Sequence, residues 1–263
     1  MANLIYRLGG EQLSVALNRR LGLPSRRTLI RNGTFININA TIGAIQQSDF
    51  ITNIRNAILS ASTTPAFSGH TVCIDEIALQ EKADFDSKSQ RVVGICHQHA
   101  DAVNLTIRDA ESAIRIAESL SGEECHLGKE ATVIAITTWG NDSIHPVLAA
   151  ASCKSETPAQ IAAIIKDAIR SWSDSGAKHK LGPIWSVATD GDATRRRGFH
   201  DEFLKHKINE LAEISQLSIP FGDVRLLPGL NCFVGDECVT LDFDPKHIFK
   251  RKFFYFTFIM HCL

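Results

Sequence analysis

The order of apolar segments after residue 70 is the feature that most constrains the fold. Short apolar runs at 71–79, 90–99 and 131–139 predict strands, because each is bounded by polar or turn-forming residues. After them, predicted helices alternate with predicted strands. Early strands followed by such alternation are typical of a mixed sheet with helices packed on it. We therefore predict an α/β protein with one large sheet.

Local signals place the remaining elements. The run 157–172 predicts a helix, because Thr157 can cap it and Pro158 suits its first turn. The polar run 81–89 predicts the turn of a hairpin between the first two strands, and 108–120 predicts an amphipathic helix. The other predicted elements are strands at 145–154, 183–191 and 237–245 and a helix at 195–215.

The first 62 residues predict a separate helical segment. Residues 9–32 have the pattern of two short helices with a break between them, which is the shape of a helix-turn-helix. The second of these helices carries Arg26, Arg27 and Arg31, so we predict that it contacts DNA. A solvated helical face explains the same arginines equally well.

Composition sets limits on the class of protein. The net charge of −1 shows that the 263-residue chain is not a basic nucleic-acid binder as a whole. Seven cysteines in such a chain do not make a disulfide framework, and no secretory signal is present, so we expect a reducing, intracellular compartment. The apolar run 253–263 is too short to cross a bilayer, and no membrane association is expected.

Two aspartates are the candidate metal ligands. Asp75 lies inside the first apolar strand, where an ionised carboxylate is costly without a partner. Asp190 ends the strand 183–191, although an Asp-Gly pair there also suits an ordinary turn. If the two strands are neighbours, the carboxylates converge and can bind Mg²⁺ or Mn²⁺. Glu76 points to the opposite face from Asp75 and is expected to play a supporting or structural part.

Two further groups of residues have the chemistry of a site. Arg195, Arg196 and Arg197 begin a predicted helix, and we predict that they contact DNA phosphates, with an exposed basic turn as the alternative. Residues 96–99 (CHQH) and 125–126 (CH) offer thiolate and imidazole ligands for zinc. They contain no C-x-x-C and would have to meet across the helical insertion, so ordinary strand-end residues are the favoured interpretation.

Several motifs in a fixed order resemble one family. They include DEIALQEKADFDSKSQRVVGICHQHA (75–100), PIWSVATDGDATRR (183–196) and DPKHIFKR (244–251). With these motifs the chain resembles P-element-like (THAP-related) DNA transposases, and it looks closest to transposase-like proteins of mushroom-forming fungi. The segment LGLPSRRTLIR (21–31) is similar to the helix-turn-helix that precedes the catalytic domain in that group.

The resemblance implies a ribonuclease-H-like core that cuts and rejoins DNA with Mg²⁺ or Mn²⁺. Asp75 matches the first catalytic acid of the family and Asp190 the second. The third acid, a glutamate on a late helix, has no matching position, so we expect this chain alone to be inactive. A substitute for the third metal ligand could come from one of three acids on or beside the last strand, which are Asp236, Asp242 and Asp244.

The resulting organisation has three parts: a helical segment at 1–62, an incomplete ribonuclease-H-like core at 70–251 and an aberrant apolar tail at 252–263. The resemblance implies DNA as a partner, a nuclear location and possible self-association. The alternative is a non-catalytic DNA-binding or self-associating protein derived from a transposon. An exonuclease of the same fold is disfavoured, because such enzymes place two acids two residues apart on the first strand, whereas here the acids are adjacent.

Overall fold

The computed structural model describes residues 38–59, 68–140, 144–190, 192–207 and 233–243. All of them belong to one compact unit that begins at Ile38. The predicted helix-turn-helix at 9–32 and the apolar tail therefore lie outside the described residues. Among the described residues, no helix has the length and apolar character needed to cross a membrane.

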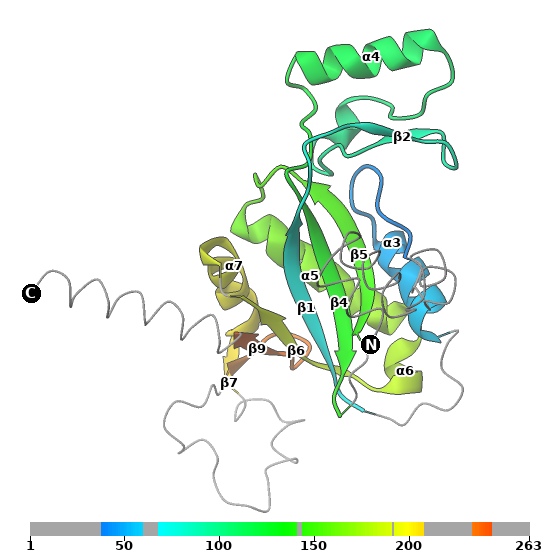
Figure 1. The fold of residues 1–263 in the computed structure, drawn as a ribbon. Coiled ribbons are helices and arrows are strands. Elements are labelled where there is room, and N and C mark those ends of the chain that lie inside the picture. Colours follow the sequence, from blue (N-terminus) through cyan, green and yellow to red (C-terminus); the bar gives the residue numbers. More distant parts are fainter. Residues whose placement is uncertain (1–37, 60–67, 141–143, 191, 208–232, 244–263) are drawn as a thin grey trace, which may run out of the picture. The chain divides into compact units, whose positions relative to one another are not determined.

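A five-stranded mixed sheet forms the centre of the described unit, with the strand order β5-β4-β1-β6-β9 (Figure 1). The first three of these strands pair antiparallel, whereas β6 lies parallel to β1 and β9 parallel to β6. This strand order and these directions are those of a ribonuclease-H-like sheet, and the predicted fold class is confirmed. The strands are β1 His70–Ala78, β4 Glu130–Thr138, β5 Ile144–Ser152, β6 Ile184–Thr189 and β9 Thr240–Phe243.

Helices flank the sheet. The long helix α5, Pro158–Asp174, starts as predicted: the Thr157 hydroxyl accepts the Gln160 N–H, and the Gln160 side chain accepts the Thr157 N–H. Helix α3, Gln47–Ile54, packs on α5 and β5 in the same unit as the sheet. The remaining helices and turns are η1 Arg55–Leu59, η2 Ala100–Ala102, α4 Ala110–Ser121, α6 Ala177–Leu181 and α7 Ala193–Phe203.

The core lies on one face of the sheet. Alternate strand residues such as Val72, Ile134 and Val187 are fully buried there. Trp172 of α5 is buried among them and donates its indole N–H to the Gly182 carbonyl at 2.8 Å. The opposite face carries small or half-exposed residues, and Trp139 and Trp185 pack edge to face with centroids 5.1 Å apart. The sheet therefore has one tightly packed face and one open face.

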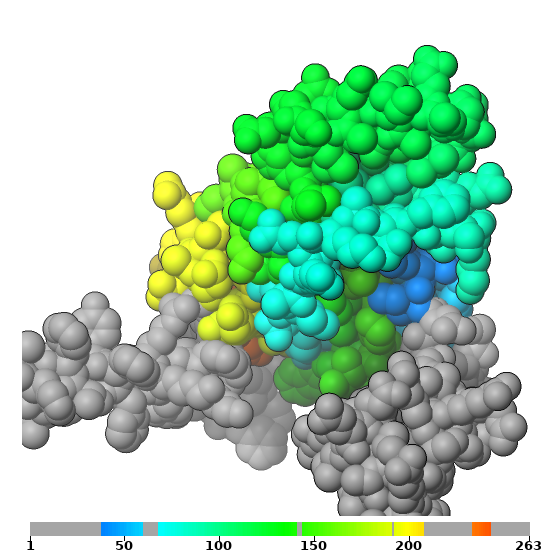
Figure 2. Space-filling model, turned by 45° about the horizontal axis from the view of Figure 1, so that its top comes forward, coloured from blue at the N-terminus to red at the C-terminus, as the bar shows by residue number. Residues whose placement is uncertain are grey.

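An insertion at 79–129 separates β1 from β4. It contains a two-stranded hairpin of β2, Asp84–Asp86, and β3, Arg91–Val93, together with η2 and α4. Its own buried residues form a second apolar cluster that includes Val92 and Ile116. The space-filling view shows the insertion's cyan and green atoms as a lobe above the sheet (Figure 2).

Two predicted elements are wrong in detail. The run 90–99 was expected to pair with the first strand, but β3 ends at Val93 and pairs with β2. Gly94 ends the strand, because its φ of +88° turns the chain and a side chain there would meet the Lys82 carbonyl. Helix α7 ends at Phe203 rather than 215, and β7 (His206–Lys207) follows and pairs with β8 (Phe233–Val234).

A buried glycine sets how closely α7 approaches α5. A Cβ at Gly198 would lie 2.2 Å from the Pro158 carbonyl oxygen, a backbone atom that cannot move aside easily. We expect Gly198→Ala to lower the free energy of unfolding by about 2 kcal/mol, although alanine favours a helix interior by about 1 kcal/mol. Urea denaturation followed by circular dichroism measures this change.

The control is His200→Ala on the exposed side of the same helix. It is expected to change the free energy of unfolding by less than about 0.5 kcal/mol. A Gly198→Ala protein as stable as the wild type would contradict the close approach.

His70, at the start of β1, is a buried neutral imidazole. Its Nδ1 lies 3.1 Å from the Thr138 hydroxyl and its Nε2 lies 3.4 Å from the Leu181 carbonyl oxygen. Burial lowers the pKa of His70 below 6.5, with a smaller opposing effect from the hydrogen bond to Leu181. Protonation therefore favours the unfolded chain.

Because the folded pKa of His70 is depressed, its contribution to stability is present above pH 6.5 and is lost as the pH falls below that value. We expect the wild type to lose more unfolding free energy than His70→Gln between about pH 7.5 and about pH 5.5, by the order of 1 kcal/mol. Urea titrations at both pH values measure the difference. Equal losses in the two proteins would show that His70 does not titrate differently on folding.

Candidate functional site

The parallel pairing of β1 with β6 places the two candidate aspartates at the same level of the sheet. Ile74 of β1 lies opposite Thr189 of β6 in the register. Asp75 follows Ile74 within β1, and Asp190 follows Thr189, the last residue of β6. The two predicted strands are therefore neighbours, which was the condition for the two carboxylates to converge.

The side chains of the adjacent residues Asp75 and Glu76 point to opposite sides of the sheet. Asp75 is exposed, and its Oδ1 accepts the N–H of Glu76 at 2.9 Å. Glu76 follows on the other face and borders a pocket that Asp190 also borders. The structure therefore brings Asp190 together with Glu76, whereas Asp75 does not line this pocket.

The pocket has a volume of about 240 Å³ and is strongly acidic. Two cationic side chains, Lys154 and Arg195, border it as well. Sequence reasoning did not select Glu130 and Glu156, because they lie far from the two aspartates along the chain and follow no motif. The carboxylates that line the pocket belong to Glu76, Glu130, Glu156, Asp190 and Asp192.

Arg195 is the central cation of the pocket. It is only 2 % exposed, and its guanidinium pairs with the Glu76 carboxylate and, at 3.0 Å, with Asp190 Oδ1. Burial lowers the pKa of Arg195, and the negative charge of Asp75 opposes this shift. The same guanidinium lies 3.3 Å from the Thr189 hydroxyl and 3.4 Å from the Ile74 carbonyl oxygen, so it contacts both β6 and β1.

The turn after β6 explains why Arg195 points inward. Asp192 caps α7, with its carboxylate accepting the Thr194 N–H at 2.8 Å. Asp190 Oδ1 accepts the N–H of Asp192 at 3.0 Å, which is the hydrogen bond expected of an aspartate in a turn. The helix therefore starts directly above the strand end, and Arg195 in its first turn lies over β1 and β6.

The three consecutive arginines have different surroundings. Arg195 is buried and paired with acids, whereas Arg196 and Arg197 are exposed on α7. Only the latter two present their charge to solvent and remain candidates for DNA phosphates. Arg26, Arg27 and Arg31 lie outside the described residues.

Two other acids of the pocket have cationic or hydrogen-bonding partners. Lys154 Nζ lies 2.6 Å from Glu130, and His97 Nε2 lies 2.9 Å from Glu156. Burial raises the pKa of Glu156, but hydrogen bonds from His97 and Ser152 outweigh it and hold the pKa below its ordinary value. Glu156 is therefore an anion in a nearly buried position.

The acids suggested as substitutes for a third ligand are dispersed. Asp236 pairs with Lys205 at 3.0 Å and with His206 at 3.1 Å. Asp242 is exposed on β9, and Asp244 lies outside the described residues. Of these acids, the two that the structure describes, Asp236 and Asp242, do not line the pocket.

Comparisons with known proteins add one finding. A solved structure described as "Drosophila P element transposase strand transfer complex" is similar with a TM-score of 0.37 and 12% sequence identity. The similarity covers 79% of this chain and 35% of that chain, so this chain spans about a third of the length of the one it matches. A likeness of this size carries no argument about fold or function. No family model and no curated protein matches the chain.

The ion pairs of Arg195 can be tested by removing the charge and keeping the volume. Arg195→Met leaves the Glu76 and Asp190 carboxylates facing each other without a cation, so we expect the free energy of unfolding to fall by about 3 kcal/mol. Added Mg²⁺ or Mn²⁺ should raise the thermal midpoint of this variant more than that of the wild type, because a dication can replace the lost charge. Thermal unfolding with and without the metal measures both effects.

The control is Arg196→Met, which removes an exposed charge from the same helix turn. It is expected to change the free energy of unfolding by less than about 0.5 kcal/mol. If both variants are equally stable, the guanidinium of Arg195 does not balance the two acids.

Proposed function

We propose that the described sheet is the core of a P-element-like DNA transposase, related to the THAP group and to the transposase-like proteins of fungi. In this proposal Asp75 and Asp190 bind Mg²⁺ or Mn²⁺ for phosphodiester chemistry on DNA. The observation that carries it is the register of β1 and β6, which puts both aspartates at one level on neighbouring parallel strands. The order of motifs along the sequence supports the same assignment.

The residues present suit a hard dication. Carboxylate oxygens are the ligands that Mg²⁺ and Mn²⁺ prefer, and Asp75 and Asp190 each supply one such group. When bound, the ion stabilises negative charge on phosphate oxygens and activates the attacking oxygen. Asp190 also contacts Arg195 at 3.0 Å, so the guanidinium competes with a metal for this carboxylate.

The exposed arginines are proposed to bind DNA. Arg196 and Arg197 lie on the first turns of α7, close in sequence to Asp190, and would bind DNA phosphates beside the acids. Arg26, Arg27 and Arg31 of the N-terminal segment would add a second contact. A nuclear location and self-association belong to the same proposal.

A non-catalytic DNA-binding protein is the second candidate, and the position of Arg195 favours it. The guanidinium already neutralises Glu76 and Asp190 inside the pocket. A site whose acids are balanced by an internal cation has less need of a metal. In this case the arginines bind DNA and the carboxylates serve the fold alone.

Metal binding and DNA binding can be measured separately on the same protein. We expect Mn²⁺, followed by electron paramagnetic resonance, to bind the wild type and to bind Asp75→Ala and Asp190→Ala at least about tenfold more weakly. Asp84→Ala, which removes an exposed acid from the insertion hairpin, is the matched control and should bind as the wild type does. Unchanged Mn²⁺ affinity in both site variants would exclude the metal centre.

Duplex DNA binding tests the arginines. Affinity is expected to fall with salt, and Arg196→Ala with Arg197→Ala should lower the slope of log K against log[salt] by about 2, one for each lost phosphate contact. Fluorescence anisotropy with a labelled duplex measures it. Salt-dependent binding without any Mn²⁺ binding would support the non-catalytic candidate, and an absence of DNA binding would contradict both.

A further inference from the structure

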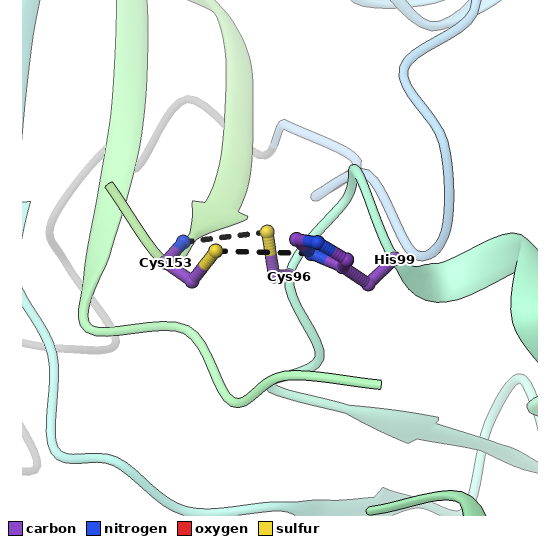
Figure 3. Close-up of side chains that lie close together, drawn as sticks. All are labelled: Cys96, His99 and Cys153. Carbon is purple, nitrogen blue, oxygen red and sulfur yellow. Dashed lines mark hydrogen bonds between the residues drawn. The ribbon is translucent and has the colours of Figure 1, made fainter. Parts of the chain in front are cut away.

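Two cysteines and a histidine meet where the insertion joins the sheet (Figure 3). The ligand atoms of Cys96, His99 and Cys153 all lie within 4.8 Å of one another. Cys153 Sγ lies 3.7 Å from His99 Nδ1, and the Cys153 N–H donates to Cys96 Sγ at 3.3 Å. Cys96 and His99 follow β3, whereas Cys153 directly follows β5, so segments from two parts of the fold contribute.

A second histidine lies beside this group. The ring of His126 is 4.0 Å from the ring of His99, centroid to centroid. The His126 carbonyl accepts the N–H of Cys96 at 2.8 Å, which holds the two segments together. Two cysteines and two histidines therefore lie close together: Cys96, Cys153, His99 and, beside His99, His126.

We propose that Cys96, His99 and Cys153, with His126 as the fourth ligand, form a structural zinc site that fastens the insertion to the end of β5. The site goes beyond the proposed function and does not depend on it.

The spacing and the ligand types fit zinc. In a tetrahedral site with zinc–sulfur bonds of about 2.3 Å and zinc–nitrogen bonds of about 2.0 Å, ligand atoms lie about 3.3–3.8 Å apart, and a sulfur and a nitrogen lie about 3.5 Å apart. The observed sulfur–nitrogen distance of 3.7 Å falls in this range. Two thiolates and two imidazoles select zinc over Mg²⁺, which prefers oxygen, so this site and the carboxylate pocket would take different ions.

The position of the cluster suits a structural ion. Cys96 is fully buried. A bound dication deprotonates a coordinating thiol and so removes the cost of burying its charge. Four side chains that close around an ion leave no position for substrate, which is the pattern of structural rather than catalytic zinc.

The neighbouring contacts show what the ion would stabilise. The His97 N–H donates to the Ala151 carbonyl of β5 at 2.8 Å, and the Gly128 N–H donates to Gly94 at 2.8 Å. His97 also bonds to Glu156, which lines the acidic pocket. An ion at the cluster would therefore hold the base of the insertion and, through His97, the position of one pocket carboxylate.

Metal content of the purified full chain tests the proposal. Inductively coupled plasma mass spectrometry should find about one zinc ion per wild-type chain. Cys96→Ser and Cys153→Ser should each lose most of the zinc, and His126→Gln should retain less than the wild type. Cys73→Ser, which changes a half-buried cysteine in the middle of β1, is the matched control and should keep its zinc.

Cobalt substitution of the wild type keeps the test decisive if a cysteine variant fails to fold. Co²⁺ should give a thiolate-to-metal charge-transfer band and the intense d–d bands of a tetrahedral site, and added zinc should remove them. Wild-type protein with less than about a tenth of a zinc ion per chain and no cobalt spectrum would overturn the proposal. A mass that is two hydrogens lighter, with Cys96 and Cys153 joined in one peptide, would overturn it in favour of a disulfide.

Discussion

The parallel pairing of β1 with β6 is the contact on which the candidate site depends. It sets Asp75 level with Asp190 and lets α7 start directly above the strand end. Arg195, in the first turn of that helix, is thereby buried against both strands and pairs with Glu76 and Asp190. A shift of one residue in this register would turn Asp190 away from Glu76 and Arg195 and separate these charges.

Because Arg195 pairs with Asp190, the pocket can be either an internal ion-pair network or part of a metal site. A buried guanidinium between two carboxylates balances charge and stabilises the fold, because the guanidinium alone would be an uncompensated buried ion. In a metal-dependent enzyme a divalent cation would instead bind Asp190 together with Asp75. The two possibilities differ in whether Asp190 binds only Arg195 or also a metal ion. The positions of the acids on the strands are the same in both.

The insertion adds a second centre of different chemistry. Its small apolar cluster supplies a limited core, and the cysteines and histidines lie where its base meets β5. A zinc ion there would strengthen the attachment of a lobe that has few apolar residues of its own. Since His97 reaches Glu156, the order of the lobe and the geometry of the acidic pocket are physically connected.

The sequence by itself determined the five strands of the main sheet, the helices α4 and α5 with the cap of α5, and the two candidate aspartates, because periodicity, capping residues and an acid in an apolar strand are local signals. It did not determine that β3 leaves the main sheet, that Arg195 turns inward while Arg196 and Arg197 face solvent, or that Glu130 and Glu156 join the pocket. It also gave no sign that Cys153 meets Cys96 and His99, 57 and 54 residues away. These features depend on which strands become neighbours, and strand pairing is decided by packing over the whole chain rather than by any one segment.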